Sequence, residues 1–237
     1  MNYSTILYYV LRIPAVLIAL TFHECAHGWM SYKLGDPTAK NLGRLTLNPI
    51  KHIDPIGFLM MIVVGFGYAK PVPINSRYYS KPKRDMALTA AAGPVMNIIL
   101  AILSVLIFNL FAMAAPDPDK YEDIPVVLFC TMCFFVITAQ LNLFLALFNL
   151  IPVPPLDGSR IAYIFLPTKW YFGLMRYERY IMIGFMALVI ILHRVFGISI
   201  ISGVSMFFLG NLEALISKIP AFSKGLKWFV RIIFGGI

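Results

Sequence analysis

The heptapeptide Thr21-Phe22-His23-Glu24-Cys25-Ala26-His27 lies inside an apolar stretch that runs from Ile13 to Tyr32. Residues four apart share one face of a helix, so the two histidines can bind one zinc ion, with the glutamate beside them as a general base. Chance would produce this pattern in roughly one such chain in a thousand. A polar cluster that only hydrogen-bonds inside a helix bundle is the alternative, but such groups are costly at membrane depth. We therefore interpret the stretch as a metal site.

The composition is that of an integral membrane protein. Hydrophobic residues make up 59% of the chain and charged residues only 13%, far below the roughly 25% of soluble domains. No charged n-region, short apolar segment and small-residue cleavage site precede the first apolar run, so we expect this span to be retained. The net charge of +9 forms no basic stripe, and we expect no nucleic-acid partner.

Four apolar regions approach or exceed the roughly 20 residues that a membrane span requires: residues 6–32, 86–115, 125–152 and 180–212. The last is interrupted by His193-Arg194. Because the tail beyond it is basic, we expect that tail to face inward, which favours two short spans with a turn at His193-Arg194 over one long tilted span. The tail, residues 213–237, has the composition of an amphipathic surface helix.

Charged residues between the spans predict their orientation. The connection 116–124 is acidic, whereas the connection 33–85 carries nine basic residues, which are Lys33, Lys40, Arg44, Lys51, Lys70, Arg77, Lys81, Lys83 and Arg84. By the positive-inside rule the basic connection is cytoplasmic. The two histidines then lie near the cytoplasmic end of the first span, and the segment after the third span emerges at the same membrane level.

Within the basic connection, Pro55 to Gly65 is apolar but only about half a span long. We expect a membrane-dipping piece that leads into a short strand at residues 68–74. Such a strand could pair with an unwound substrate by β-augmentation.

Asp157 is the candidate for the third ligand that a catalytic zinc ion needs. It follows Asn149-Leu150-Ile151-Pro152-Val153-Pro154-Pro155-Leu156, where three prolines end the helix at the predicted cytoplasmic boundary. The alternative is an aspartate that caps the next helix or forms a turn with Gly158. The need for a ligand and the matching membrane depth favour coordination.

The chain resembles the site-2 protease family of intramembrane metalloproteases, peptidase family M50, in particular its small members that lack PDZ and CBS domains. The resemblance covers most of residues 10–190 and rests on several ordered motifs. These are the heptapeptide, Asp36-Pro37-Thr38-Ala39-Lys40, Gly43-Arg44-Leu45-Thr46-Leu47-Asn48-Pro49, His52-Ile53-Asp54-Pro55, Ala69-Lys70-Pro71-Val72-Pro73, Gly93-Pro94-Val95-Met96-Asn97 and residues 149–158.

This resemblance implies an all-α polytopic membrane protein with a three-helix catalytic core and one or two C-terminal spans. It also implies that His23, His27 and Asp157 bind one Zn²⁺ per chain and that Glu24 is the catalytic base. Asn97 and Asn149 would lie near bound substrate, although either asparagine could simply hydrogen-bond between helices. His52 is better explained as a polar loop residue than as a fourth ligand, because three ligands leave the open position that catalysis needs.

We therefore expect one membrane domain spanning residues 1–237, with a catalytic core at about 6–160 and C-terminal spans and a basic tail at about 178–237. The expected activity is that of a zinc metalloendopeptidase that cleaves transmembrane protein or peptide substrates in regulated intramembrane proteolysis. The expected location is the bacterial plasma membrane, with the active site near the cytoplasmic side and a separate regulatory membrane protein as a candidate partner. The rival class is a membrane zinc transporter or sensor without proteolytic activity. That class usually presents ionisable residues along its path, and spans 86–115 and 125–152 contain no Asp, Glu, Lys, Arg or His.

Overall fold

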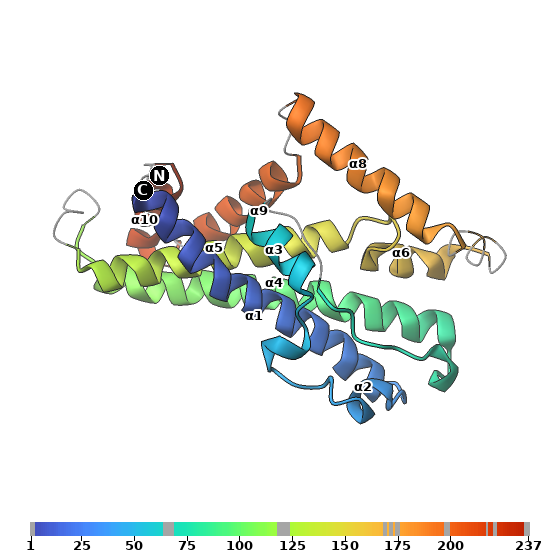
Figure 1. Ribbon diagram of the computed structural model, residues 1–237. Coiled ribbons are helices and arrows are strands. Elements are labelled where there is room, and N and C mark those ends of the chain that lie inside the picture. Colours follow the sequence, from blue (N-terminus) through green and yellow to red (C-terminus); the bar gives the residue numbers. More distant parts are fainter. Residues whose placement is uncertain are drawn as a thin grey trace.

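Three long helices that lie side by side form the core of the chain (Figure 1). They are α1 (Tyr3–Lys33), α4 (Pro82–Ala114) and α5 (Val126–Asn149). The structure is a computed structural model that describes residues 3–63, 69–117, 124–167, 170, 173, 176–196, 200–216, 218–219 and 222–234. Each of the three helices is long and apolar enough to cross a membrane. The predicted all-α polytopic membrane fold is thereby confirmed.

Small side chains allow the core helices to approach one another closely. Ala15 and Ala19 of α1 are fully buried and belong to one apolar cluster with Ile137 and Leu141 of α5. Small residues at such contacts are typical of helix packing in lipid. The outer surface of α4 instead exposes large apolar residues: Leu88, Val95, Ile98, Ile99, Ile102, Leu103, Leu110 and Met113. In a membrane this surface needs no protein partner, because lipid tails cover it.

Helix α4 begins four residues before the predicted span. Pro82 occupies its first turn, where a missing N–H costs nothing, and Asp85 Oδ2 accepts the backbone N–H of Lys81 at 2.9 Å. The helix ends at Ala114, shortly before Pro116. The polar first turn therefore extends the helix out of the apolar region on the side of the basic connection.

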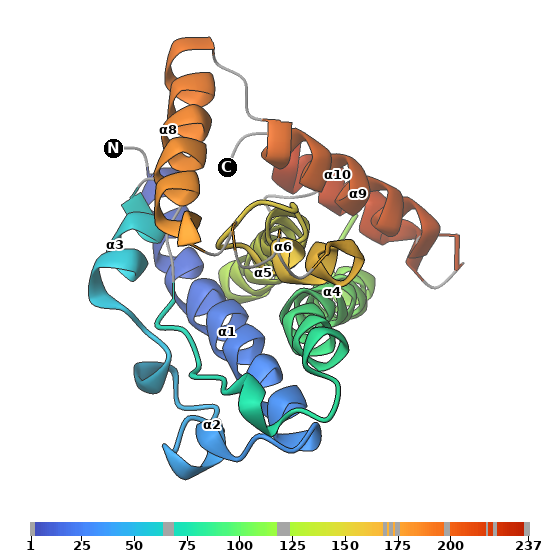
Figure 2. The same cartoon turned by 90° about the vertical axis from the view of Figure 1, so that its right-hand side faces the viewer.

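The connection between α1 and α4 folds as short helices joined by loops. These are α2 (Thr38–Asn41), the 3-10 helix η1 (Pro49–Lys51), α3 (Pro55–Val63) and the 3-10 helix η2 (Ser76–Tyr78). With nine residues, α3 is only about 14 Å long and cannot cross a bilayer. It packs against α1 (Figures 1 and 2), so the short apolar piece expected here is a helix. Gly65, the predicted end of that piece, lies outside the described residues.

The predicted strand at residues 68–74 does not form in its described part. Tyr68 lies outside the described residues, and residues 69–74 have no regular secondary structure. Pro71 and Pro73 have no N–H group to offer to a neighbouring strand. The N–H groups of Lys70 and Val72 already donate to the carbonyl of His52 and the carboxylate of Glu24, both at 2.9 Å. No main-chain N–H group from Lys70 to Pro73 is therefore free to pair with a neighbouring strand.

Helix α5 ends at Asn149, and the proline-rich segment that follows is irregular, as predicted. This segment contains a cis peptide bond between Pro154 and Pro155. The chain then enters α6 (Asp157–Ala162) and the 3-10 helix η4 (Tyr163–Phe165). Helix α6 packs against α4, which returns the start of α6 to the three-helix core.

Two further helices, α8 (Glu178–Phe196) and α9 (Ile200–Ile216), follow in the C-terminal part and run at an angle to each other (Figure 1). The predicted turn at His193-Arg194 is wrong, because α8 continues through both residues. Neither residue breaks a helix, and the described part of α8 runs to Phe196. The number of C-terminal spans stays a prediction.

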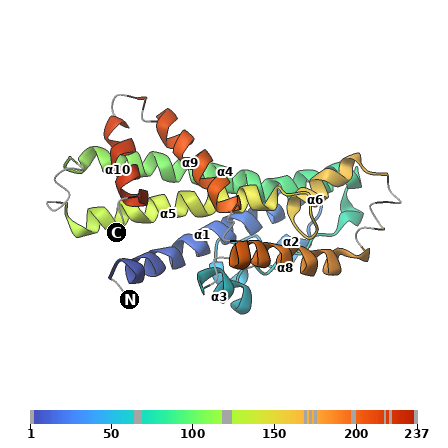
Figure 3. The ribbon, with the colours of Figure 1, turned by 90° about the horizontal axis from the view of Figure 1, so that it is seen from above.

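Helix α10 (Ser223–Phe234) packs against α4 and α9. The side chain of Trp228 is fully buried, and its Nε1–H donates to the carbonyl of Pro116 at 3.1 Å. The tail is therefore helical, as predicted, but its apolar side is buried against protein. It lies at the end of the core where α4 ends (Figure 3), whereas the basic connection from α1 to α4 lies at the other end. The two basic regions therefore do not share one side of the core, and which of them faces inward stays a prediction.

Candidate metal centre

Three side chains from distant parts of the sequence converge inside the core. His23 and His27 lie one turn apart on α1, and Asp157 is the first residue of α6. The Nε2 atoms of the histidines are 3.0 Å apart, and Asp157 Oδ2 lies 3.2 Å from that of His23 and 3.1 Å from that of His27. Both histidines are buried. The structure thus brings together the three residues that the depth argument placed at one membrane level.

Hydrogen bonds to the other ring nitrogens determine the histidine tautomers. His27 Nδ1 lies 2.7 Å from the carbonyl oxygen of Thr89, which can only accept a hydrogen bond, so this nitrogen carries the proton. His23 Nδ1 bonds to the side-chain oxygen of Asn97 in the same way. In a neutral imidazole with Nδ1 protonated, Nε2 presents a lone pair. Both Nε2 lone pairs therefore face the convergence point.

This arrangement fits a metal ion. Asp157 Oδ2 is buried and has no hydrogen-bond partner among the described residues. With both imidazoles neutral, two nitrogen lone pairs and one carboxylate oxygen would meet here, which is costly unless a cation lies between them. Donors around a tetrahedral Zn²⁺, at about 2.0–2.1 Å from the ion, are themselves about 3.3 Å apart. The observed separations of 3.0–3.2 Å are close to that spacing.

The charge of the carboxyl group agrees with a ligand role. Burial alone would raise the pKa of Asp157, but in the metal-free protein the positive charge of a protonated His27 and hydrogen bonds from both histidines outweigh burial and hold that pKa well below its usual range. Asp157 is therefore a carboxylate. A zinc ion bound here would take the place of the proton on His27, and the carboxylate would then supply one negative charge beside two neutral imidazoles.

Glu24 is buried next to the histidines and is hydrogen-bonded to the connection between α1 and α4. One of its carboxylate oxygens, Oε2, accepts the backbone N–H of Val72 at 2.9 Å. A general base acts at a heavy-atom distance of about 2.6–3.2 Å from the group whose proton it removes, so its orientation matters. The sequence predicts Glu24 as the base but contains no signal for its partner, because that partner is a main-chain group.

Two glycines allow the backbone to approach the site. A Cβ on Gly93 of α4 would overlap both imidazoles, and it would lie 2.6 Å from His23 Cε1. A Cβ on Gly158 would overlap the carbonyl of Leu150, at the end of α5. Only glycine fits at either position. Both residues belong to the motifs quoted above, which is the signal that marks them.

Three asparagines near the core have different surroundings. The side-chain amide of Asn97 is fully buried, and its Nδ2 donates to Asn142 Oδ1 at 2.7 Å and to the carbonyl of Ala19 at 3.4 Å. Asn97 therefore orients His23, and Asn142 orients Asn97. Asn142 was not predicted, although a polar residue inside an apolar span is itself a functional signal. Asn149 Nδ2 donates to the carbonyl of Leu145 in its own helix, and its role near substrate stays a prediction.

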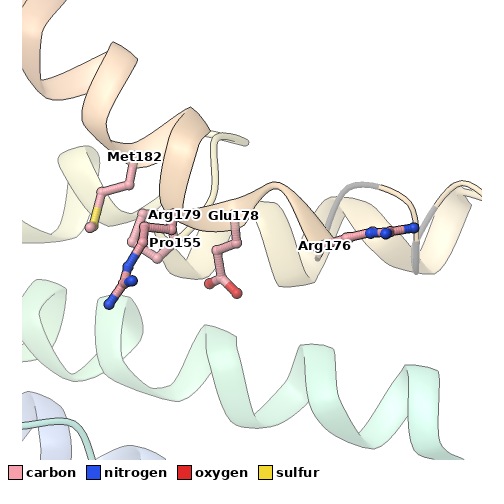
Figure 4. Close-up of a pocket in the computed structure, with 5 residues that line it drawn as sticks. All are labelled: Pro155, Arg176, Glu178, Arg179 and Met182. Atoms are coloured by element: carbon pink, nitrogen blue, oxygen red, sulfur yellow. The ribbon is translucent and has the colours of Figure 1, made fainter.

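His52 lies outside this cluster. It is fully buried, and its Nε2 bonds to the carbonyl of Thr46 at 2.8 Å. A separate pocket of about 350 Å³ opens beside Pro155, where α8 begins, and is lined by Arg176, Glu178, Arg179 and Met182 (Figure 4). None of the proposed zinc ligands lines this pocket.

Comparisons with known proteins agree with the site. The model of peptidase family M50 matches residues 12–117 and 127–192. "Putative zinc metalloprotease YwhC" of Bacillus subtilis is 43% identical over 187 residues, which cover 77% of this chain and 83% of the relative. "Putative zinc metalloprotease Rip2" of Mycolicibacterium smegmatis is 28% identical over 156 residues, which cover 63% of this chain and 55% of the relative. No solved structure matches the chain.

Proposed function

This chain belongs to peptidase family M50, the site-2 protease family of zinc metallopeptidases, and we propose that it hydrolyses peptide bonds in or beside the transmembrane segments of membrane-protein substrates. The observation that carries the proposal is the convergence of two imidazole lone pairs and one carboxylate oxygen within helices long enough to span a bilayer. A catalytic centre within the thickness of the membrane can reach transmembrane segments of substrates, which soluble proteases cannot reach.

In this proposal His23, His27 and Asp157 hold the zinc ion. Three protein ligands leave the open position that distinguishes catalytic from structural zinc sites. A zinc ion bound there supplies Lewis acidity, which makes water a competent nucleophile near neutral pH. Asn97 and Thr89 fix the orientation of the two imidazoles through their Nδ1 atoms.

Glu24 is the proposed general base. Its carboxylate takes the proton of the attacking water and then delivers that proton to the leaving nitrogen of the cleaved peptide bond. The hydrogen bond from Val72 leaves its second oxygen, Oε1, for this transfer. A transmembrane substrate must unwind locally before its carbonyl groups are accessible, so Asn149 is proposed as a polar contact for the unwound segment.

The proposed location of the active site is near the cytoplasmic side of the cell membrane. The support is the charge of the connection from α1 to α4, which lies at the same end of the core as His27. Regulated intramembrane proteolysis, in which a separate membrane protein controls access, is the proposed physiological setting.

The test reconstitutes the purified chain with a fluorogenic transmembrane peptide in lipid vesicles. We expect cleavage that a zinc chelator stops and added Zn²⁺ restores. Glu24→Gln should abolish cleavage while the protein keeps one bound zinc ion, because the amide cannot accept a proton. Asp157→Ala should lower the bound zinc measured by mass spectrometry.

Two results would contradict the proposal. Turnover retained by Glu24→Gln would exclude Glu24 as the base. Zinc flux across the vesicle membrane without any peptide cleavage would instead support the transporter class.

A further inference from the structure

The connection between α1 and α4 holds residues 69–75 against the catalytic helix from both ends. At one end, Lys70 donates its N–H to the carbonyl of His52 at 2.9 Å, and Arg44 Nη2 donates to the carbonyl of Lys70 at 2.8 Å. At the other end, Asn75 donates its N–H to Asp36 Oδ2 at 2.7 Å. The motifs that contain Asp36, Arg44 and His52 are thus joined to the motif at residues 69–73, and none of the four carries a proposed zinc ligand.

The middle of this segment offers a single hydrogen-bond donor. In Pro71-Val72-Pro73 both prolines lack an N–H group, so the main-chain donor is that of Val72. This N–H lies 2.9 Å from Glu24 Oε2, and Val72 is only 6% exposed. Water therefore cannot easily replace the bond. The sequence Pro-Val-Pro restricts the main-chain donors between residues 71 and 73 to the one that meets the proposed base.

Asp36 anchors the far end of the segment and is itself fully buried. Its carboxylate also accepts hydrogen bonds from the hydroxyl of Ser31, at 2.9 Å, and from the N–H and hydroxyl of Thr38. Burial alone would raise the pKa of Asp36, but these donors together with the Asn75 N–H hold it below its usual value. The anchor is therefore a charged acceptor, which makes stronger hydrogen bonds than a neutral one.

The same anchor reaches the histidine side of the site. The hydroxyl of Ser31 also bonds to that of Tyr79 at 2.7 Å, and Tyr79 bonds to the hydroxyl of Thr89 at 3.0 Å. The carbonyl of Thr89 in turn accepts the Nδ1–H of His27. One buried network therefore connects the surroundings of Glu24 with those of a proposed zinc ligand.

We propose that the main-chain N–H of Val72 is a positioning group for the base, held in register by Asp36 and Arg44. It binds Oε2 of Glu24, fixes the glutamate rotamer and leaves Oε1 directed to the water that Glu24 deprotonates. A glutamate has three rotatable side-chain bonds, and a displacement of about 1 Å at a catalytic group costs about 100-fold in rate. This role rests on the proposed proteolysis, but the hydrogen bond itself does not.

The first test measures that hydrogen bond without activity and without bound zinc. Residue-resolved hydrogen exchange of the metal-free protein should show a protected Val72 amide. Glu24→Ala removes the acceptor and should accelerate exchange at Val72 at least tenfold, with Lys70 and Asn75 unchanged. Glu24→Gln keeps a side-chain oxygen and should preserve most of the protection. Equal exchange at Val72 in all three proteins would overturn the proposal.

The second test removes the donor. Val72→Pro should lower kcat about 100-fold with KM within about twofold and one zinc ion still bound, because only the base is displaced. Val72→Ala keeps the amide and should lose far less. Ile74→Pro is the matched control, because no described group accepts a hydrogen bond from the Ile74 N–H.

These outcomes separate the two proposals. If the wild-type protein cleaves no transmembrane peptide, the proposed function fails, and the exchange experiment still decides whether Val72 binds Glu24. If the wild-type protein cleaves and Val72→Pro is as active as Val72→Ala, the positioning role is wrong and the protease function stands.

Discussion

At the scale of single residues, the site depends on the absence of a side chain as much as on its ligands. Gly93 lies where α4 passes directly over the imidazoles of His23 and His27. The close approach lets the neighbouring Thr89 and Asn97 reach the two Nδ1 atoms. A helix without glycine at this point would have to move away from α1, and both imidazoles would lose the groups that orient them.

Gly93→Ala should therefore weaken zinc binding without unfolding the core. The added methyl overlaps ring atoms of His27 and would lie 2.6 Å from His23 Cε1, so the ligand geometry must change. Disruption of orienting groups typically costs 10–100-fold in metal affinity, and we expect about this loss in a chelator competition. Gly184→Ala is the control, because no atom in the described part of the chain lies within 4 Å of its added Cβ. Equal zinc affinity in both variants would refute the steric argument.

At the scale of elements, the proline-rich segment after α5 determines where Asp157 lies. The prolines prevent α5 from continuing, and the chain turns back so that α6 starts against the last turn of α5. Gly158 makes this contact possible, since any Cβ there would overlap the carbonyl group of Leu150. The position of the third ligand is thus set by the contact between two helix ends.

Gly158→Ala should displace the start of α6 and with it Asp157. We expect lower zinc stoichiometry and lost cleavage, and a loss of stability of about 1–3 kcal/mol from overpacking. Zinc content by mass spectrometry and thermal unfolding in detergent measure the two effects. Gly173→Ala serves as the control, because its added Cβ meets no atom of the described residues within 4 Å. Full zinc content in Gly158→Ala would show that α6 tolerates the shift.

At the scale of the whole molecule, a buried polar pair joins the C-terminal helices to the core. Asn109 of α4 donates to Glu213 Oε2 of α9 at 2.8 Å, and both side chains are fully buried. Asn109 Oδ1 and Glu213 Oε1 have no hydrogen-bond partner among the described residues. Gly225 of α10 covers the pair, since its Cβ would lie 2.7 Å from Glu213 Oε1. One hydrogen between the two unpaired oxygens would satisfy both.

Glu213→Gln should therefore stabilise the fold, because its amide can donate to Asn109 Oδ1 while its oxygen still accepts from Asn109. Glu213→Ala should destabilise it by about 1–3 kcal/mol, since it leaves the buried Asn109 amide with the carbonyl of Val105 in its own helix as its remaining partner among the described residues. Thermal unfolding should show shifts of about 2–4 °C per kcal/mol, in opposite directions. Asn109 lies twelve residues beyond Asn97 on α4, about 18 Å away, so zinc binding should not change. A lower melting temperature for Glu213→Gln than for the control Glu178→Gln would contradict this account.

The sequence alone determined the features that depend on local chain geometry. Apolar runs predict the three long helices, because lipid leaves the backbone no other way to pair its polar groups. The four-residue spacing of His23 and His27 follows from the helical repeat, and the prolines before Asp157 predict the end of α5. Charge between the spans places Asp157 at the membrane level of the histidines.

Only the tertiary structure decided which groups complete the site. Asn97, Thr89 and the amide of Val72 act through contacts between segments 48–74 residues apart. The contact between Val72 and Glu24 also replaced the predicted strand with an irregular segment, and separate contacts of α10 buried the tail against α4. Periodicity and composition predict which face of its own helix a residue occupies and whether that face is apolar. Which helix faces that residue depends on packing across the whole chain, and no local pattern contains that information.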